Sequence, residues 1–130
     1  MRLARTLATL SFCAILLGCG QSTLSEAQVR GVAVDYVSAL CRDDSAVVAQ
    51  LTSRQSEPHG PGELRETLFG SANPFAPASV SVYGVESARA SSLVRLEVVD
   101  TSAAPHDVDV IVFSEDGVGV VGAVSSADPQ

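Results

Sequence analysis

The chain has 130 residues and a formal net charge of −7, with eight arginines, no lysine and 15 acidic residues. This length suffices for one domain. The charge disfavours nucleic acid as a partner, because so few cations cannot neutralise a row of phosphates. Aromatic residues make up 5% of the chain and tryptophan is absent, so we expect a core of valine, leucine and alanine.

The N-terminal segment carries the clearest functional signal. Its first ten residues include two arginines and no acidic residue, and an apolar run then continues to Gly18. This run of about a dozen apolar residues matches the hydrophobic region of an export signal, and it falls short of the ~20 that a membrane-spanning helix needs. The run closes with Leu16-Leu17-Gly18-Cys19, which resembles the lipobox of a bacterial lipoprotein.

The lipobox resemblance implies that residues 1–18 are a signal peptide, cleaved between Gly18 and Cys19. It further implies that Cys19 carries palmitate-type acyl chains, and that residues 19–24 tether the protein to the extracytoplasmic side of the cell membrane or the outer membrane. Each buried CH₂ contributes ~0.8 kcal/mol, so two or three chains hold a protein stably. The alternatives are an ordinary secretory signal and an uncleaved anchor.

The mature chain would keep six arginines against 15 acidic residues, a formal charge of −9. This charge disfavours direct adhesion to anionic headgroups, so the acyl chains must do the anchoring. Of the three cysteines, Cys13 would leave with the signal and Cys19 would be acylated. The remaining Cys41 cannot form an intrachain disulfide. We expect it to pack as a small hydrophobic residue on a helix, although intermolecular pairing is the alternative.

The first strong structural pattern begins at Ser25. Ser25 and Gln28 are spaced as a capping box, and Glu26 favours the positive end of the helix dipole. Apolar residues then recur at three- and four-residue steps as far as Leu40. We therefore predict a long helix over residues 26–41, with one face turned to the core.

Two shorter helices are predicted next. Either Asp43 or Asp44 caps a helix that ends near Leu51. The polar, proline-broken stretch that follows is typical of a loop. Pro61 suits the first turn of a third helix, and Gly70 suits its C-terminal cap.

From Ser79 the apolar residues recur with a period of two, which is typical of β-strands. Asp116-Gly117 is the strongest hairpin signal in the chain. Helices followed by an antiparallel meander of about four strands define an α+β fold, with one long and two short helices packed on a curved sheet. The strands are expected around residues 80–83, 94–98, 108–112 and 118–124. The single domain should cover residues 25–125, with residues 126–130 as a polar tail.

Residues 34–44 and 46–51 are similar to the opening of small exported proteins of the nuclear-transport-factor-two-like superfamily, which has a cystatin-like α+β fold. There a long helix, an acidic turn and a short alanine-rich helix precede a curved sheet. The resemblance implies that the long helix lies across the concave face of the sheet and can enclose a pocket. The chain departs from the family pattern at Val118 and Val120, where an aromatic residue, usually tryptophan, is common.

Two tyrosines are the possible pocket residues under this resemblance: Tyr36 on the inner face of the long helix and Tyr83 on the first strand. Some members of the superfamily are enzymes, and Asp100 and His106 bracket a loop where they could move protons. Tyr36 is more simply a core aromatic whose hydroxyl finds one partner. No catalytic residue is assigned, because no nucleophile elbow, phosphate loop or dinucleotide fingerprint places one.

The letters Gly117-x-Gly119-x-x-Gly122 match the spacing of a dinucleotide-binding loop. They follow a turn rather than a strand-to-helix junction, so we interpret them as an edge or bent strand whose glycines allow close approach.

Neither a metal nor a cofactor is predicted. His59 and His106 lie on separate loops without closely spaced partner ligands. Asp107 and Asp109 share a strand face, so a weak calcium site is conceivable, but the segment lacks the ligand alternation of a calcium-binding hand. An acidic solvated edge that discourages sheet-to-sheet aggregation is the preferred interpretation.

The sequence therefore favours a lipid-anchored extracytoplasmic module that binds a partner, such as another envelope protein, without catalysis. The alternative is a small-molecule carrier, or an isomerase- or cyclase-like enzyme, with a pocket between the long helix and the sheet. A closed, valine-filled interior would favour the first hypothesis. A cavity of several hundred Å³ with Tyr36 in its wall would favour the second.

Overall fold

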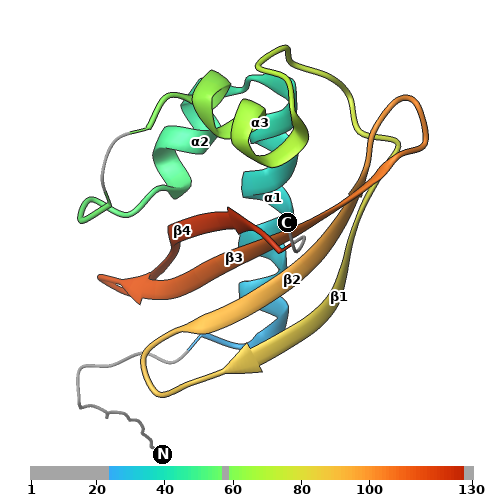
Figure 1. The fold of residues 1–130 in the computed structure, drawn as a ribbon. Helices are drawn as coiled ribbons and strands as arrows, with labels where there is room; N and C mark the ends of the chain where they lie inside the picture. Colours follow the sequence, from blue (N-terminus) through green and yellow to red (C-terminus); the bar gives the residue numbers. More distant parts are fainter. Residues whose placement is uncertain (1–23, 57–58, 128–130) are drawn as a thin grey trace, which may run out of the picture.

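A computed structural model describes residues 24–56 and 59–127 as three helices followed by a four-stranded sheet. The helices lie on one face of the sheet, which is strongly twisted (Figure 1). The predicted α+β fold is therefore confirmed. Gly18 and Cys19, with the rest of the export signal, lie outside the described residues. The elements are α1 (Glu26–Arg42), α2 (Ser45–Leu51), α3 (Pro61–Phe69), β1 (Ser79–Ser87), β2 (Ser92–Val99), β3 (Pro105–Glu115) and β4 (Val118–Ser126).

The helix boundaries follow the local capping signals. The Ser25 hydroxyl accepts a bond from the Gln28 amide at 3.1 Å, and the Ser25 amide donates to the Gln28 side chain at 2.8 Å. Both halves of the predicted capping box are thus present. At the second helix the cap is Asp44, whose carboxylate accepts from the Val47 amide at 3.4 Å. Asp43 instead ends α1 in the left-handed conformation.

The sheet is an antiparallel meander in the order β1-β2-β3-β4, so β1 and β4 are its edges. Register shifts between Val82 and Gly84, and at Ile111/Val112, mark bulges that bend the strands. In the last hairpin Asp116 and Gly117 both have positive φ, 55° and 82°, as the predicted tight turn requires. The predicted tail begins too early, because residue 126 still pairs with β3.

The interior between α1 and the sheet is closed and consists mainly of valine. Alternate residues of β2 and β3 face α1 and are fully buried, together with Val37, Leu40 and Cys41 of the helix. Burial raises the pKa of the Cys41 thiol to about 11, so it stays protonated and packs as a small hydrophobic residue. The buried strand residues are Val94, Leu96, Val98, Val108 and Val110.

A glycine brings β4 close to α1. A Cβ atom added at Gly119 would lie 2.8 Å from a methyl carbon of Val32 and 3.3 Å from Leu24. The glycine-rich segment is therefore a strand that needs a small residue for close approach, as the sequence analysis proposed.

A buried arginine, which the pattern analysis did not anticipate, joins α3 to the end of α1. Arg65 is 4% exposed. Its guanidinium donates to the Ala72 carbonyl at 2.7 Å, to the Leu40 carbonyl at 2.9 Å and to the Asp43 carboxylate at 3.1 Å. In the last turn of α1 the Leu40 carbonyl accepts only a long bond of 3.4 Å from the Asp43 amide, and Arg65 gives it a second, shorter one.

Candidate functional site

A cavity of about 280 Å³ lies where α1, α2, α3 and β4 meet. Its wall combines apolar side chains from these elements with hydroxyl groups and one imidazole. Since one water molecule occupies about 30 Å³ in the liquid, the cavity has room for a ligand of roughly nine non-hydrogen atoms. The lining residues are Tyr36, Val48, Thr52, Ser56, His59, Leu64 and the β4 residues Val121, Gly122, Ala123 and Val124.

Residues 52–56 form one side of the cavity because they are bound to the edge of β4. The Ser53 amide donates to the Val121 carbonyl, and the Ser56 hydroxyl donates to the Gly122 carbonyl, both at 2.9 Å. An edge strand presents backbone groups without strand partners, and this segment satisfies two of them. The cavity is thus built on a hydrogen-bonded frame.

The Glu115 side chain holds the same segment from the end of β3. One carboxylate oxygen accepts from the Ser53 hydroxyl at 2.8 Å, and the other accepts from the Arg54 amide at 3.2 Å. The hydrogen bond from Ser53 is the main reason that the pKa of Glu115 is lowered. The carboxylate is therefore ionised, both of its oxygens accept hydrogen bonds from residues 53 and 54, and it positions this segment beside the cavity.

Tyr36 is the most buried polar side chain of the cavity wall, at 3% exposure, and the Thr52 side chain lies near its hydroxyl. Burial raises the pKa of Tyr36, so the phenol stays neutral. The Thr52 hydroxyl donates its proton to the Val48 carbonyl at 2.5 Å. A hydroxyl has one proton, so Thr52 has none left to donate to a ligand.

The two hydroxyl groups of the cavity wall that come from residues 52–56 have their protons committed. Thr52 donates to Val48, and Ser56 donates to Gly122. Each hydroxyl oxygen keeps lone pairs, so the wall can accept hydrogen bonds more readily than it can donate them. His59 lies at the cavity with Nδ1 3.7 Å from the Glu63 carboxylate, which adds a negative charge nearby.

The second predicted pocket tyrosine lies elsewhere. Tyr83 is 56% exposed at the β1 bulge and is not among the residues that line this cavity. The strand period placed it correctly on β1, but the bulge and the edge position leave its ring outside. The two tyrosines therefore do not share the cavity.

Asp100 and His106 do come together, at the β2–β3 turn. His106 Nε2 is 2.9 Å from Asp100, whose other oxygen accepts from the amides of Ser102 and Ala104 at 2.8 and 3.0 Å. The hydrogen bond with His106 is the largest cause holding the pKa of Asp100 well below its usual value. The His106 ring packs edge-on against Phe69, with centroids 5.3 Å apart, so this pair braces the turn against α3.

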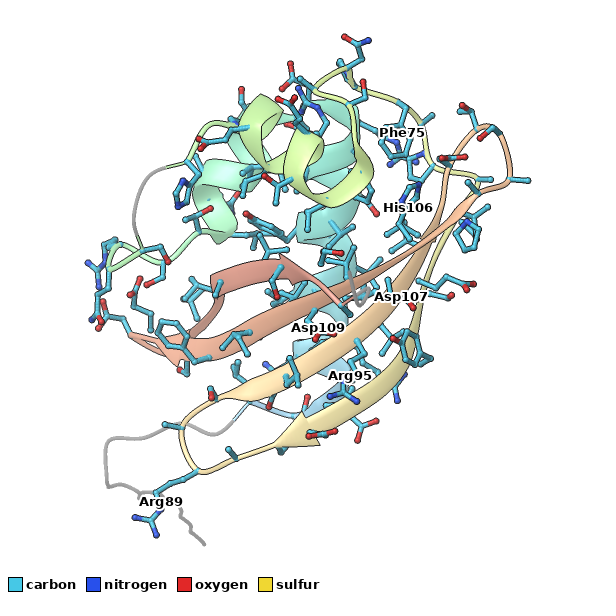
Figure 2. All side chains as sticks on the ribbon, viewed as in Figure 1. Phe75, Arg89, Arg95, His106, Asp107 and Asp109 are labelled. Atoms are coloured by element: carbon cyan, nitrogen blue, oxygen red, sulfur yellow. The ribbon has the colours of Figure 1, made fainter. Side chains whose placement is uncertain are left out.

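The two histidines thus lie in different parts of the domain, since His59 lines the cavity and His106 lies with Asp100 near Phe75 (Figure 2). Asp109 is on β3, with one oxygen 3.8 Å from Arg95 Nε. That distance is within ion-pair range but too long for a hydrogen bond, and the oxygen has no hydrogen-bond partner among the residues that the structure describes. Within residues 24–56 and 59–127, no three His, Cys, Asp or Glu side chains are grouped to hold a metal ion.

No protein-family model matches the chain, and no curated protein is significantly similar to it. Of the residues that line the cavity, Tyr36 was expected from the helix pattern, whereas Thr52 and Ser56 were not. Those two lie in a polar stretch whose only sequence signal was that of a loop.

Proposed function

We propose that the chain is an exported, lipid-anchored binding module on the extracytoplasmic side of a membrane. The lipobox-like residues 16–19 support the anchor. Among residues 24–56 and 59–127, no helix has both the length and the apolarity to cross a membrane. The similarity of residues 34–51 to the nuclear-transport-factor-two-like superfamily, with a long helix across a curved sheet, supports membership in that superfamily.

The anchor is tested by growing cells with a clickable palmitate analogue and comparing the wild type with Cys19→Ala. Label should be found on the wild type alone, and the N-terminal peptide should have the mass of an acylated residue 19. Cys13→Ala is the matched control, because it removes a thiol without changing the lipobox. Label that persists in Cys19→Ala would refute the assignment.

The cavity beside Tyr36 carries the proposal for what the module binds. Its size suits a small molecule, and its committed hydroxyl protons favour a ligand that supplies a hydrogen-bond donor. Val48, Leu64 and Val124 provide an apolar wall. The ligand is therefore a small amphipathic alcohol or amine, held without chemical change.

This binding is tested with three probes that share one ring: cyclohexanol, cyclohexylamine and cyclohexanecarboxylate. In ¹H–¹⁵N spectra of the mature protein, the alcohol and the amine should shift the amides of residues 121–124, and the carboxylate should do so far less. Val124→Phe fills the cavity and should abolish the shifts. Val80→Phe makes the same change at a half-buried valine of β1 and should preserve them. Preferred binding of the carboxylate would overturn the donor argument.

A protein partner on the uncovered face of the sheet is the second candidate. Leu93, Ile111 and Phe113 alternate with buried core residues and are only half-buried, and Tyr83 is largely exposed. Such a mixture of aromatic and aliphatic groups suits a protein interface. In-cell crosslinking through Tyr83→Cys, followed by mass spectrometry, should recover one stable envelope protein. Recovery of none would remove this candidate.

A further inference from the structure

Positive charge is unevenly distributed over the domain. Arg30, Arg54, Arg65 and Arg95 each have a carboxylate within 4.0 Å. The other arginine of α1, Arg42, lies in its last turn, where a cation favours the negative end of the helix dipole. The sixth, Arg89, is exposed in the β1–β2 turn and has no carboxylate at ion-pair distance in the part of the chain that the structure describes.

Arg89 projects from the end of the sheet that lies farthest from α2 and α3 (Figures 1 and 2). The turn around it contains only serine and alanine, so residues 87–92 carry a net charge of +1. The nearest acidic residue on β1, Glu86, pairs with Arg95 at 3.5 Å, although Arg95 also lies 3.8 Å from Asp109. The tip is therefore a small cationic surface on an acidic molecule.

The chain enters the domain at this same end. Leu24 and the turn residues 87–92 line one shallow hollow, with Val29 and Phe113. Leu24 packs against the hydrophobic core, and the Ser25–Gln28 capping box follows at once. The point where the N-terminal segment joins the domain is therefore fixed beside Arg89. The 17 residues of α1 place Arg42 about 25 Å away along the helix.

The covalent length of the tether limits how far this end can move from an acyl anchor. Leu24 lies five positions after Cys19, and an extended chain spans at most ~3.6 Å per residue, so the reach is about 18 Å. Charges near a membrane interact within a Debye length of about 8–10 Å. A tether of this length lets Arg89 come within range of the surface, while the remaining carboxylates are repelled by anionic lipid.

We propose that the β1–β2 turn is a membrane-contact surface, with the Arg89 guanidinium on the phosphates of anionic lipid headgroups. A guanidinium donates two parallel hydrogen bonds to a phosphate, which suits a single orienting contact. This inference rests on the proposed acyl anchor at Cys19. The acyl chains hold the protein, and Arg89 orients it, so that α2, α3 and the opening of the cavity stand away from the bilayer.

The test uses the full chain, acylated by its bacterial host and reconstituted in vesicles of phosphatidylcholine, alone or mixed equally with phosphatidylglycerol. A donor fluorophore is attached through Ala90→Cys in the turn or Thr67→Cys on α3, and a headgroup-labelled lipid is the acceptor. Buried Cys41 does not react under these conditions. Energy transfer should be stronger from residue 90 than from residue 67, and the difference should grow with phosphatidylglycerol.

In the anionic vesicles, Arg89→Ser should lower about fivefold the ratio of molecules with the β1–β2 turn on the membrane to molecules in other orientations, since one arginine near such a surface contributes about 1 kcal/mol. It should change nothing in phosphatidylcholine. Arg42→Ser removes the other arginine without an ion pair and should have no effect on either surface. Equal transfer from the two labels, or transfer independent of Arg89, overturns the orientation.

Flotation of the vesicles and the mass of the N-terminal peptide separate the two ideas. If the protein is acylated and floats but shows no dependence on Arg89, only the orientation fails. If the peptide is unmodified and the protein does not float, the anchor fails and the orientation fails with it. If the Arg89-dependent orientation appeared only when an acidic envelope protein was added, and not with anionic lipid alone, the proposal would also be overturned.

Discussion

The buried Arg65 offers the sharpest test of how the helices are held together. We change it to methionine, which keeps an unbranched apolar stem and removes every donor. Three acceptors then lose their bonds: the Leu40 carbonyl, the Ala72 carbonyl and the Asp43 carboxylate. A hydrogen bond to a charged group contributes about 1.5–3 kcal/mol, and the deepest of the three is the one to Leu40.

The three losses are unequal because water can reach two of the acceptors. The Asp43 side chain is 51% exposed, so its ion pair contributes at most about 1 kcal/mol. Ala72 is exposed as well, so water partly replaces the guanidinium there. We therefore expect Arg65→Met to lower the free energy of unfolding by about 3 kcal/mol. The free energy of unfolding of Arg65→Lys should lie between those of the wild type and Arg65→Met, because one ammonium cannot reach three separated acceptors.

Urea unfolding, followed by circular dichroism at equilibrium, measures this loss. Arg30→Met is the matched control, since Arg30 forms an exposed i,i+4 pair with Glu26 and its loss should cost only about 0.3–0.5 kcal/mol. The slope of the unfolding free energy against urea concentration should be the same in all variants, so that the midpoints of unfolding report stability. A difference below about 1 kcal/mol between the two methionine variants would show that Arg65 does not hold α3 to α1.

Three further predictions concern the acid response, the close contact and the thiol. Because the pKa of Asp100 is lowered in the folded state, the Asp100 carboxylate stabilises the fold above the unfolded pKa near 3.8, and this stabilisation is lost as the pH falls below that value. Asp100→Asn should therefore flatten the acid side of the curve of unfolding free energy against pH. Gly119→Ala should cost about 1–3 kcal/mol by overpacking, and Val32→Ala should recover part of that loss in the double variant. In mature protein with an acylated N-terminus, a maleimide should label Cys41 at least about a hundredfold faster in urea than in the native state. The reason is that the rise in the pKa of the thiol from 9.0 to about 11 lowers the thiolate fraction by that factor. Equal rates would place the thiol at the surface.

The sequence by itself determined the elements whose signals are local. The Ser25–Gln28 capping box, the Pro61 start of α3 and the Asp116-Gly117 turn involve atoms within a few residues of one another, so the chain has the same local preference whatever surrounds it. The period-two pattern likewise predicted which face of β2 and β3 is buried, but it was wrong at the start of β4, where Val118 is exposed and residues 119–121 are buried in succession. Those signals sufficed for the α+β fold.

Tertiary structure alone decided how these elements combine into a site. Thr52 and Ser56 line the cavity because residues 52–56 bind β4, more than 60 positions later in the sequence. The Asp100–His106 contact depends on how the β2–β3 turn closes, and Arg65 is buried because α3 folds back on α1. Such contacts form between side chains that are distant in the sequence and meet only when the helices have packed on the sheet. The periodicity of one segment of the chain does not show which distant segment it will contact.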